Sequence, residues 1–74
     1  MRYKVVFGPR VAVRTSPSTS AKAIGAKPKG DIVEGEFYQN VSSGQPWLWL
    51  NKDGEGGYML IDGTSVGLGT LLEP

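Results

Sequence analysis

The chain has 74 residues and a formal net charge of +1, and its 11 Gly and 5 Pro are more turn-forming residues than a helical bundle tolerates. Cys and His are both absent, which excludes disulfides, thiol nucleophiles, Cys or His zinc sites and Ser-His catalytic pairs. With 39% hydrophobic and 20% charged residues the chain should fold, as a single domain spanning residues 1–74 or as one module of a longer protein.

Apolar and polar residues alternate along the chain, a pattern that indicates β-strands. The first predicted strand covers residues 3–7, with its odd-numbered residues on one face. The second strand has Val11 and Val13 on one face and leads into an exposed loop of Thr, Ser and Pro over residues 15–20. A short extended piece over residues 23–26 follows the loop.

Two glycines, Gly25 and Gly30, fall where turns are expected, and we predict positive φ at both. The strand after the second turn is the longest. It places Val33, Gly35 and Phe37 toward the core, and Val41 as well if the strand extends that far, because its opposite face carries two glutamates.

The last third of the chain reads as a hairpin followed by a Gly-rich tail. Residues 47–50 form a strand with two apolar faces, and residues 58–61 form its partner. The connection over residues 51–57 contains an Asp-Gly pair, which is a strong hairpin signal. After the Gly-rich segment over residues 62–69, residues 70–73 are predicted to add a short strand that closes the sheet. The sequence therefore predicts an all-β fold, a small barrel of five or six short antiparallel strands.

Charge is distributed unevenly along the chain. Residues 1–30 contain seven Lys and Arg and no acid, whereas residues 31–74 contain seven acids and a single Lys. Either the two halves pair as neighbouring strands and their charges intermingle, or the surface is bipolar with a basic face. The small net charge and the few aromatics among the basic residues give no case for a nucleic-acid partner, and no apolar run is long enough for membrane insertion.

Several stretches resemble, in the right order, the bacterial SH3-like (SH3b) domain family. Residues 11–20, the pair Ile24-Gly25 and residues 29–33 resemble its "LNVRSGPSTS…VIG…KKGTKV" stretch, and residues 47–50 and 57–60 resemble its "GWYKV" and "GWV" strands. Three positions depart from the family pattern, which usually has Gly, an aromatic residue and Trp there: Pro46, Leu48 and Tyr58.

The resemblance implies an SH3-like barrel in which Trp47 and Trp49 point outward and the leucines between and after them face the core. It also implies a non-catalytic binding module, of the kind attached to larger enzymes or surface proteins, that recognises a peptide, a protein segment or a peptidoglycan peptide. Such a module would have an extracytoplasmic or cell-surface location.

We place the predicted ligand groove between the loop over residues 15–21 and the hairpin around Asp53, with Trp47 and Tyr58 as its floor. Exposed aromatic rings beside loops are how SH3-type barrels bind extended peptides. The predicted ligand-binding residues are Trp47, Trp49, Tyr58, Tyr38, Arg14 and Ser18. Neither a nucleophile-base pair nor an acid-base site can be assembled from these residues, so we predict no enzymatic activity, no metal and no cofactor.

Two alternatives stay open for the tryptophans. One of them could cover the open end of the barrel, which would leave only the other at the surface. Alternatively, the face carrying Trp47 and Trp49 could pack on another domain or on a second copy, which would make the protein a structural or assembly domain and leaves its oligomeric state open.

Overall fold

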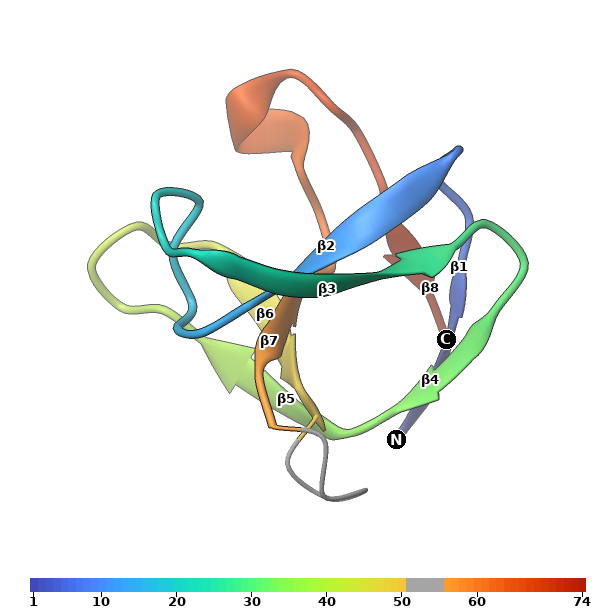
Figure 1. Ribbon diagram of the computed structural model, residues 1–74. Coiled ribbons are helices and arrows are strands. Elements are labelled where there is room, and N and C mark those ends of the chain that lie inside the picture. Colours follow the sequence, from blue (N-terminus) through green and yellow to red (C-terminus); the bar gives the residue numbers. More distant parts are fainter. Residues whose placement is uncertain (51–55) are drawn as a thin grey trace.

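Two antiparallel β-sheets make up the part of the chain that the computed structural model describes, residues 1–50 and 56–74 (Figure 1). The predicted all-β class is confirmed, and this part of the chain contains no α-helix. The elements in chain order are β1 (Arg2–Val5), β2 (Arg10–Arg14), β3 (Ala23–Pro28), β4 (Ile32–Glu34), β5 (Glu36–Gln39), β6 (Pro46–Trp49), β7 (Tyr58–Leu60), the 3-10 turn η2 (Thr64–Val66) and β8 (Leu72–Glu73).

The smaller sheet has the strand order β4-β1-β8, with the first strand of the chain in its centre. Its register places Arg2 opposite Glu34 and Lys4 opposite Glu73. In this sheet the basic and acidic halves of the chain are therefore neighbours, as the first of the two charge readings expected.

The larger sheet has the strand order β3-β2-β7-β6-β5. Its basic edge is the antiparallel pair of β2 and β3, joined by the loop of Thr, Ser and Pro. The predicted pairing of residues 47–50 with residues 58–61 is confirmed, since β6 and β7 are antiparallel neighbours. The Asp53-Gly54 turn that we predicted between them lies outside the described residues.

Gly35 is the joint between the two sheets. The single long strand predicted here is instead two strands, with β4 in the smaller sheet and β5 in the larger one (Figure 1). Gly35 is buried at the bend, and its amide donates a hydrogen bond of 3.0 Å to the Met1 carbonyl. The absence of a side chain lets the chain cross here against the backbone of Trp49.

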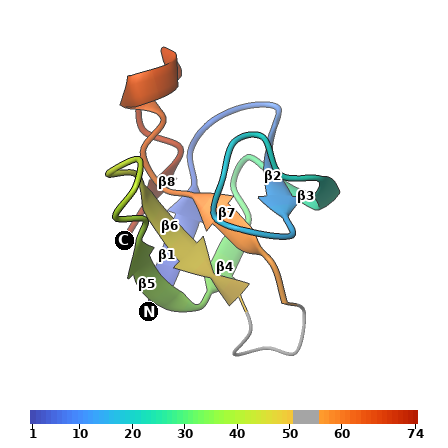
Figure 2. The same cartoon turned by 90° about the vertical axis from the view of Figure 1, so that its left-hand side faces the viewer.

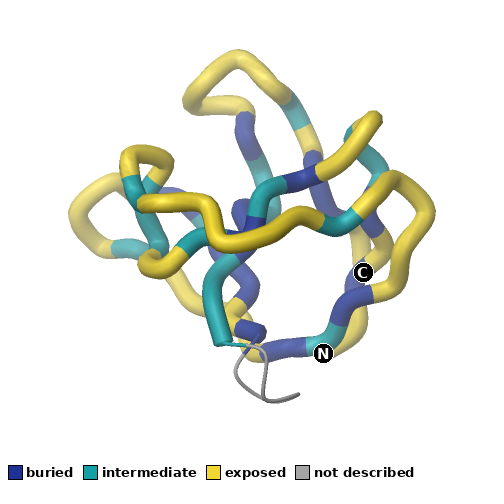
Figure 3. The backbone as a smooth tube through the Cα atoms, in the orientation of Figure 1, coloured by how far each residue is buried: buried dark blue, intermediate teal, exposed yellow. Residues whose placement is uncertain are grey.

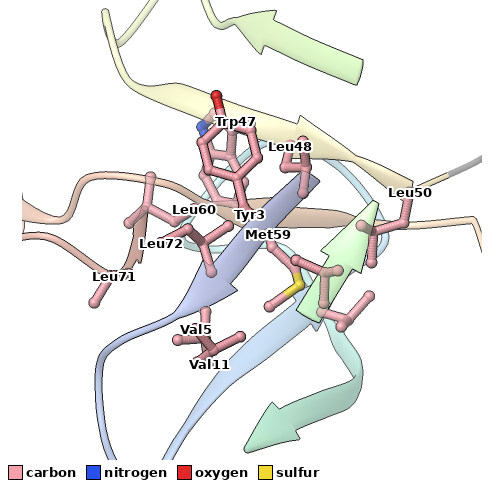
Figure 4. Close-up of a cluster of buried hydrophobic side chains, with 12 residues drawn as sticks. Tyr3, Val5, Val11, Trp47, Leu48, Leu50, Met59, Leu60, Leu71 and Leu72 are labelled. Carbon is pink, nitrogen blue, oxygen red and sulfur yellow. The ribbon is translucent and has the colours of Figure 1, made fainter. Parts of the chain in front are cut away.

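A single hydrophobic core lies between the sheets (Figures 3 and 4). This core contains Tyr3 and Val5, and Val11 and Val13, which were predicted to share one face of the first and of the second strand. Its buried members are Tyr3, Val5, Val11, Val13, Val33, Trp47, Leu48, Leu50, Met59, Leu60, Leu71 and Leu72. Phe37 and Val41 were predicted to point inward but are 48% and 92% exposed, so these two predictions are wrong. The bend at Gly35 ends the alternation that β4 sets, and β5 is an edge strand with every residue exposed.

The two predicted positive-φ glycines behave differently. Gly30 has φ of 96°, which confirms the prediction, whereas Gly25 lies inside β3 without positive φ, so that prediction is wrong. The extended piece predicted over residues 23–26 continues to Pro28, so the turn that we expected at Gly25 is part of β3 instead.

The Gly-rich segment after β7 projects from one end of the sheets as a loop around η2 (Figure 2). Its base is closed by backbone hydrogen bonds, among them Gly63 N–H to Gly69 C=O at 2.7 Å. The predicted last strand is present as β8 and pairs with β1. Among the described residues, no helix has the length and hydropathy needed to cross a membrane.

Candidate functional site

Three aromatic rings, Tyr38, Trp49 and Tyr58, lie in contact on the surface of the larger sheet, and we call them the aromatic strip. Trp49 and Tyr58 are stacked, with ring centroids 6.5 Å apart and planes 16° from parallel. Tyr38 and Tyr58 are tilted by 59°, with centroids 5.9 Å apart. The exposed fraction is 43% for Tyr38 and 39% for Trp49, so the strip offers ring surface to a ligand.

The strand register explains why these rings meet. Trp49 lies directly opposite Tyr58 in the pair of β6 and β7, so their side chains emerge on the same face. On β5, Tyr38 lies opposite Trp47, the residue two positions before Trp49, and therefore shares that face as well. The strip thus brings together three of the predicted site residues from three adjacent strands.

Trp47 does not belong to the strip. We predicted that it points outward, but its exposed fraction is 0%, and the prediction is wrong. It belongs to the same buried cluster as Tyr3, Leu60 and Leu72, which come from the first, seventh and last strands (Figure 4). Trp47 and Trp49 share a face of β6, but only Trp47 is covered, which matches the alternative in which one tryptophan is core and the other surface.

Among residues 1–50 and 56–74, no group accepts a hydrogen bond from the Nε1–H of the buried Trp47 indole. A buried N–H without an acceptor is destabilising relative to one that is paired. Trp47 is therefore held in the core by the burial of its ring rather than by polar contacts.

Arg14 connects the strip to the loop between β2 and β3. It lies opposite Tyr58 in the strand register, and its Nη1 donates a hydrogen bond of 2.8 Å to the carbonyl of Ala21 at the end of the loop. The backbone closes the same loop, since the Thr15 amide donates to the Lys22 carbonyl at 3.0 Å. Arg14 is thus placed beside the strip, while one of its donors is used within the protein.

Ser18 lies within that loop and is half-buried. Its amide donates to the Ser16 carbonyl at 2.8 Å, and its hydroxyl lies 2.8 Å from the hydroxyl of Ser20. Both contacts lie within the loop. Ser18 therefore stabilises the shape of the loop and makes no hydrogen bond to the three rings in the part of the chain that the structure describes.

Asn40 is a residue of this region that the sequence analysis missed. Its Nδ2 donates to the Pro17 carbonyl, and its Oδ1 accepts from the Ser42 amide at 2.9 Å. The first bond ties the tip of the loop to the chain two residues after Tyr38. The signal in the sequence was an Asn that begins the turn-forming segment over residues 40–44. Asn in such a turn often accepts a hydrogen bond from the amide two residues later, which predicts the bond from Ser42 but not the bond to Pro17.

The candidate site is therefore an exposed aromatic strip with a tied-down polar loop on one side. The other predicted wall, the hairpin around Asp53, lies outside the described residues. Within residues 1–50 and 56–74, no group of three or more His, Cys, Asp or Glu side chains is placed to hold a metal ion. What the described arrangement offers chemically is apolar ring faces with hydrogen-bonding groups beside them.

No family model, no curated protein and no solved structure matches this chain. Its function therefore has to be inferred from the geometry of the site.

Proposed function

We propose that this protein is a non-catalytic, SH3-like binding module of the SH3b type that holds an extended peptide segment against the aromatic strip. The observation that carries the proposal is the contact of Tyr38, Trp49 and Tyr58 on an open face of the larger sheet. Clustered rings at a surface are typical of recognition sites, because a flat, rigid ring gives a large contact area at a low cost in conformational entropy.

Several features of the fold support the SH3-like part of the proposal. The chain forms two small antiparallel sheets that share one bent stretch of strand, β4 and β5. A Ser- and Pro-containing loop joins β2 and β3, where the resemblance to SH3b domains is most specific. These features are compatible with a small barrel, and they leave the strip on the outside of the larger sheet.

The strip favours a ligand that is extended and partly apolar. Three rings side by side can take prolyl rings or aliphatic side chains on their faces. Backbone amides of such a ligand would lie next to the loop that Asn40 holds through Pro17. Pro-rich peptides and cell-wall peptides both fit this description, and we propose the extended peptide backbone as their common feature.

The test is an amide NMR titration of the labelled protein with a panel of Pro-rich and cell-wall peptides. The expected result is saturable shifts of the Trp49 indole and of the Tyr38 and Tyr58 amides. Trp49→Ala should weaken the binding by roughly tenfold or more. Phe37→Ala is the matched control, because Phe37 is similarly exposed but lies on the opposite face of β5 from Tyr38.

Binding that survives Trp49→Ala, or the absence of saturable shifts with any peptide of the panel, would overturn this function. The assembly alternative would then gain weight if the Trp49 signal broadens with protein concentration. That alternative relied on a face carrying two tryptophans, and the burial of Trp47 leaves only Trp49 to form it.

A further inference from the structure

A concave site apart from the three rings of the aromatic strip lies between β2, the loop after it and the Gly-rich segment near the C-terminus. It is a pocket of about 290 Å³. Most of the pocket's lining is apolar. Two of its lining residues, Val66 and Leu68, are 45% and 47% exposed. The apolar side chains that form its walls are Phe7, Leu60, Val66, Leu68 and Leu71.

The same pocket has a cationic side. Arg10 and Arg14 both line it, together with the hydroxyl-bearing Thr19 of the loop, and none of its described lining residues is a carboxylate. Arg14 uses one N–H for the Ala21 carbonyl, and a guanidinium has five N–H donors, so further donors remain. Two guanidiniums beside an apolar wall complement a ligand that combines a carboxylate with an apolar group.

We propose that this pocket binds the C-terminal end of a peptide whose last residue is apolar. The α-carboxylate would pair with Arg10 and Arg14, and the side chain of the same residue would lie against Val66, Leu68 and Leu60. A chain end fits better than an internal acidic residue, because its carboxylate and its side chain leave from one Cα and can both occupy a pocket this small. The proposal does not depend on ligand binding at the aromatic strip.

The uneven distribution of charge along the sequence makes this pocket positively charged. In the smaller sheet, acidic residues face the basic ones across the strands, as at Arg2 and Glu34. The pair of β2 and β3 instead comes entirely from the basic first 30 residues, so no acid from its own strands faces Arg10 or Arg14. A ligand carboxylate would supply the missing negative charge.

The experiment is an NMR titration with an acetylated tripeptide that ends in leucine with a free carboxylate, compared with the same peptide as its C-terminal amide. We expect saturable shifts at Ala12, Val66 and Leu68 with the free acid, and roughly tenfold weaker binding of the amide. Arg10→Ala should weaken the binding of the free-acid peptide by at least about threefold. Arg2→Ala, the same change of charge at an exposed position of the smaller sheet, should leave the affinity unchanged.

Two further measurements separate this pocket from the strip and from loss of the fold. Val66→Ser, at an exposed position of η2, should weaken the binding of the leucine peptide. It should not change the amide signals of the strand residues. Trp49→Ala should leave the binding of the peptide intact. Equal affinity for acid and amide, equal loss in Arg10→Ala and Arg2→Ala, or shifts confined to the aromatic strip would each overturn the proposal.

Discussion

Gly35 lies directly against the backbone carbonyl of Trp49, so closely that a Cβ on Gly35 would stand 2.1 Å from the Trp49 oxygen and 2.8 Å from its carbonyl carbon. Gly35 is the joint between the two sheets, and Trp49 stacks on Tyr58, the ring that contacts both other members of the aromatic strip. The bend that lets the chain pass from one sheet to the other therefore lies directly against the residue that carries the exposed Trp49 ring.

Gly35→Ala should be strongly destabilising, because the new methyl group would collide with backbone, which cannot rotate away as a side chain can. We expect a loss of at least about 2–3 kcal/mol in the free energy of unfolding, measured by urea denaturation. Gly25→Ala is the control, since a Cβ there meets nothing within 4 Å. Equal stability of the two variants would contradict the role of Gly35 as the joint.

The two tryptophans of β6 should respond differently to truncation. Trp47→Ala removes a fully buried ring and should cost about 3–5 kcal/mol, which is comparable to the whole stability of so small a domain. Trp49→Ala removes an exposed, stacked ring and should cost only about 1–2 kcal/mol. Thermal unfolding followed by far-UV circular dichroism would test this contrast, and a folded Trp47→Ala protein would count against its place in the core.

The Asn40 side chain should control the order of the loop over residues 15–21. Asn40→Asp keeps the oxygen that accepts from Ser42 but places a carboxylate oxygen against the Pro17 carbonyl, where the amide now donates. We expect a stability loss of about 1 kcal/mol and faster amide hydrogen exchange confined to the loop. Exchange that is unchanged in the loop would show that the bond to Pro17 does not restrain it.

The carboxyl group of Asp62 should titrate below its ordinary range. Hydrogen bonds from the Thr64 hydroxyl and, second, from the Thr64 amide lower the pKa of Asp62. A carboxyl with a lowered folded-state pKa stabilises the fold above its unfolded pKa, and this contribution disappears as the pH falls through the folded value.

A carbon-detected NMR titration of the side-chain carboxyl groups would measure this pKa directly. Thr64→Val removes the hydroxyl donor and keeps the amide, so the pKa of Asp62 should rise toward the ordinary value without reaching it. An unshifted Asp62 in the wild-type protein, or no change in Thr64→Val, would contradict the assignment.

Gly30→Val should destabilise the turn between β3 and β4 through the backbone alone. Gly30 has φ of 96°, and a Cβ there would meet nothing within 4 Å, so no collision contributes. We expect a cost on the order of 1–2 kcal/mol, seen as a lower melting temperature. Gly30→Asn should cost less, because Asn tolerates positive φ better than a β-branched residue does. An unchanged melting temperature in Gly30→Val would refute the importance of this conformation.

Most of the strands were predictable from the sequence, because alternation is a local property. Neighbours in the chain and turn residues predicted that Val11 and Val13 share a face and that β6 pairs with β7. The family resemblance predicted that Trp49 is exposed, which is confirmed, but it predicted the same of Trp47, which is buried.

The sequence by itself thus determined that this chain is all-β and which residues of the first two strands share a face. Tertiary structure alone decided that Trp47 is buried while Trp49 on the same face is not, that Gly35 divides one strand between two sheets, and that Asn40 holds the loop at Pro17. The physical reason is that each of these three outcomes depends on a segment far away in the chain. Such a segment covers Trp47, passes against Gly35 or accepts the hydrogen bond of Asn40. Local periodicity sets the face on which a side chain emerges, but only the packing of the whole chain sets what lies on that face.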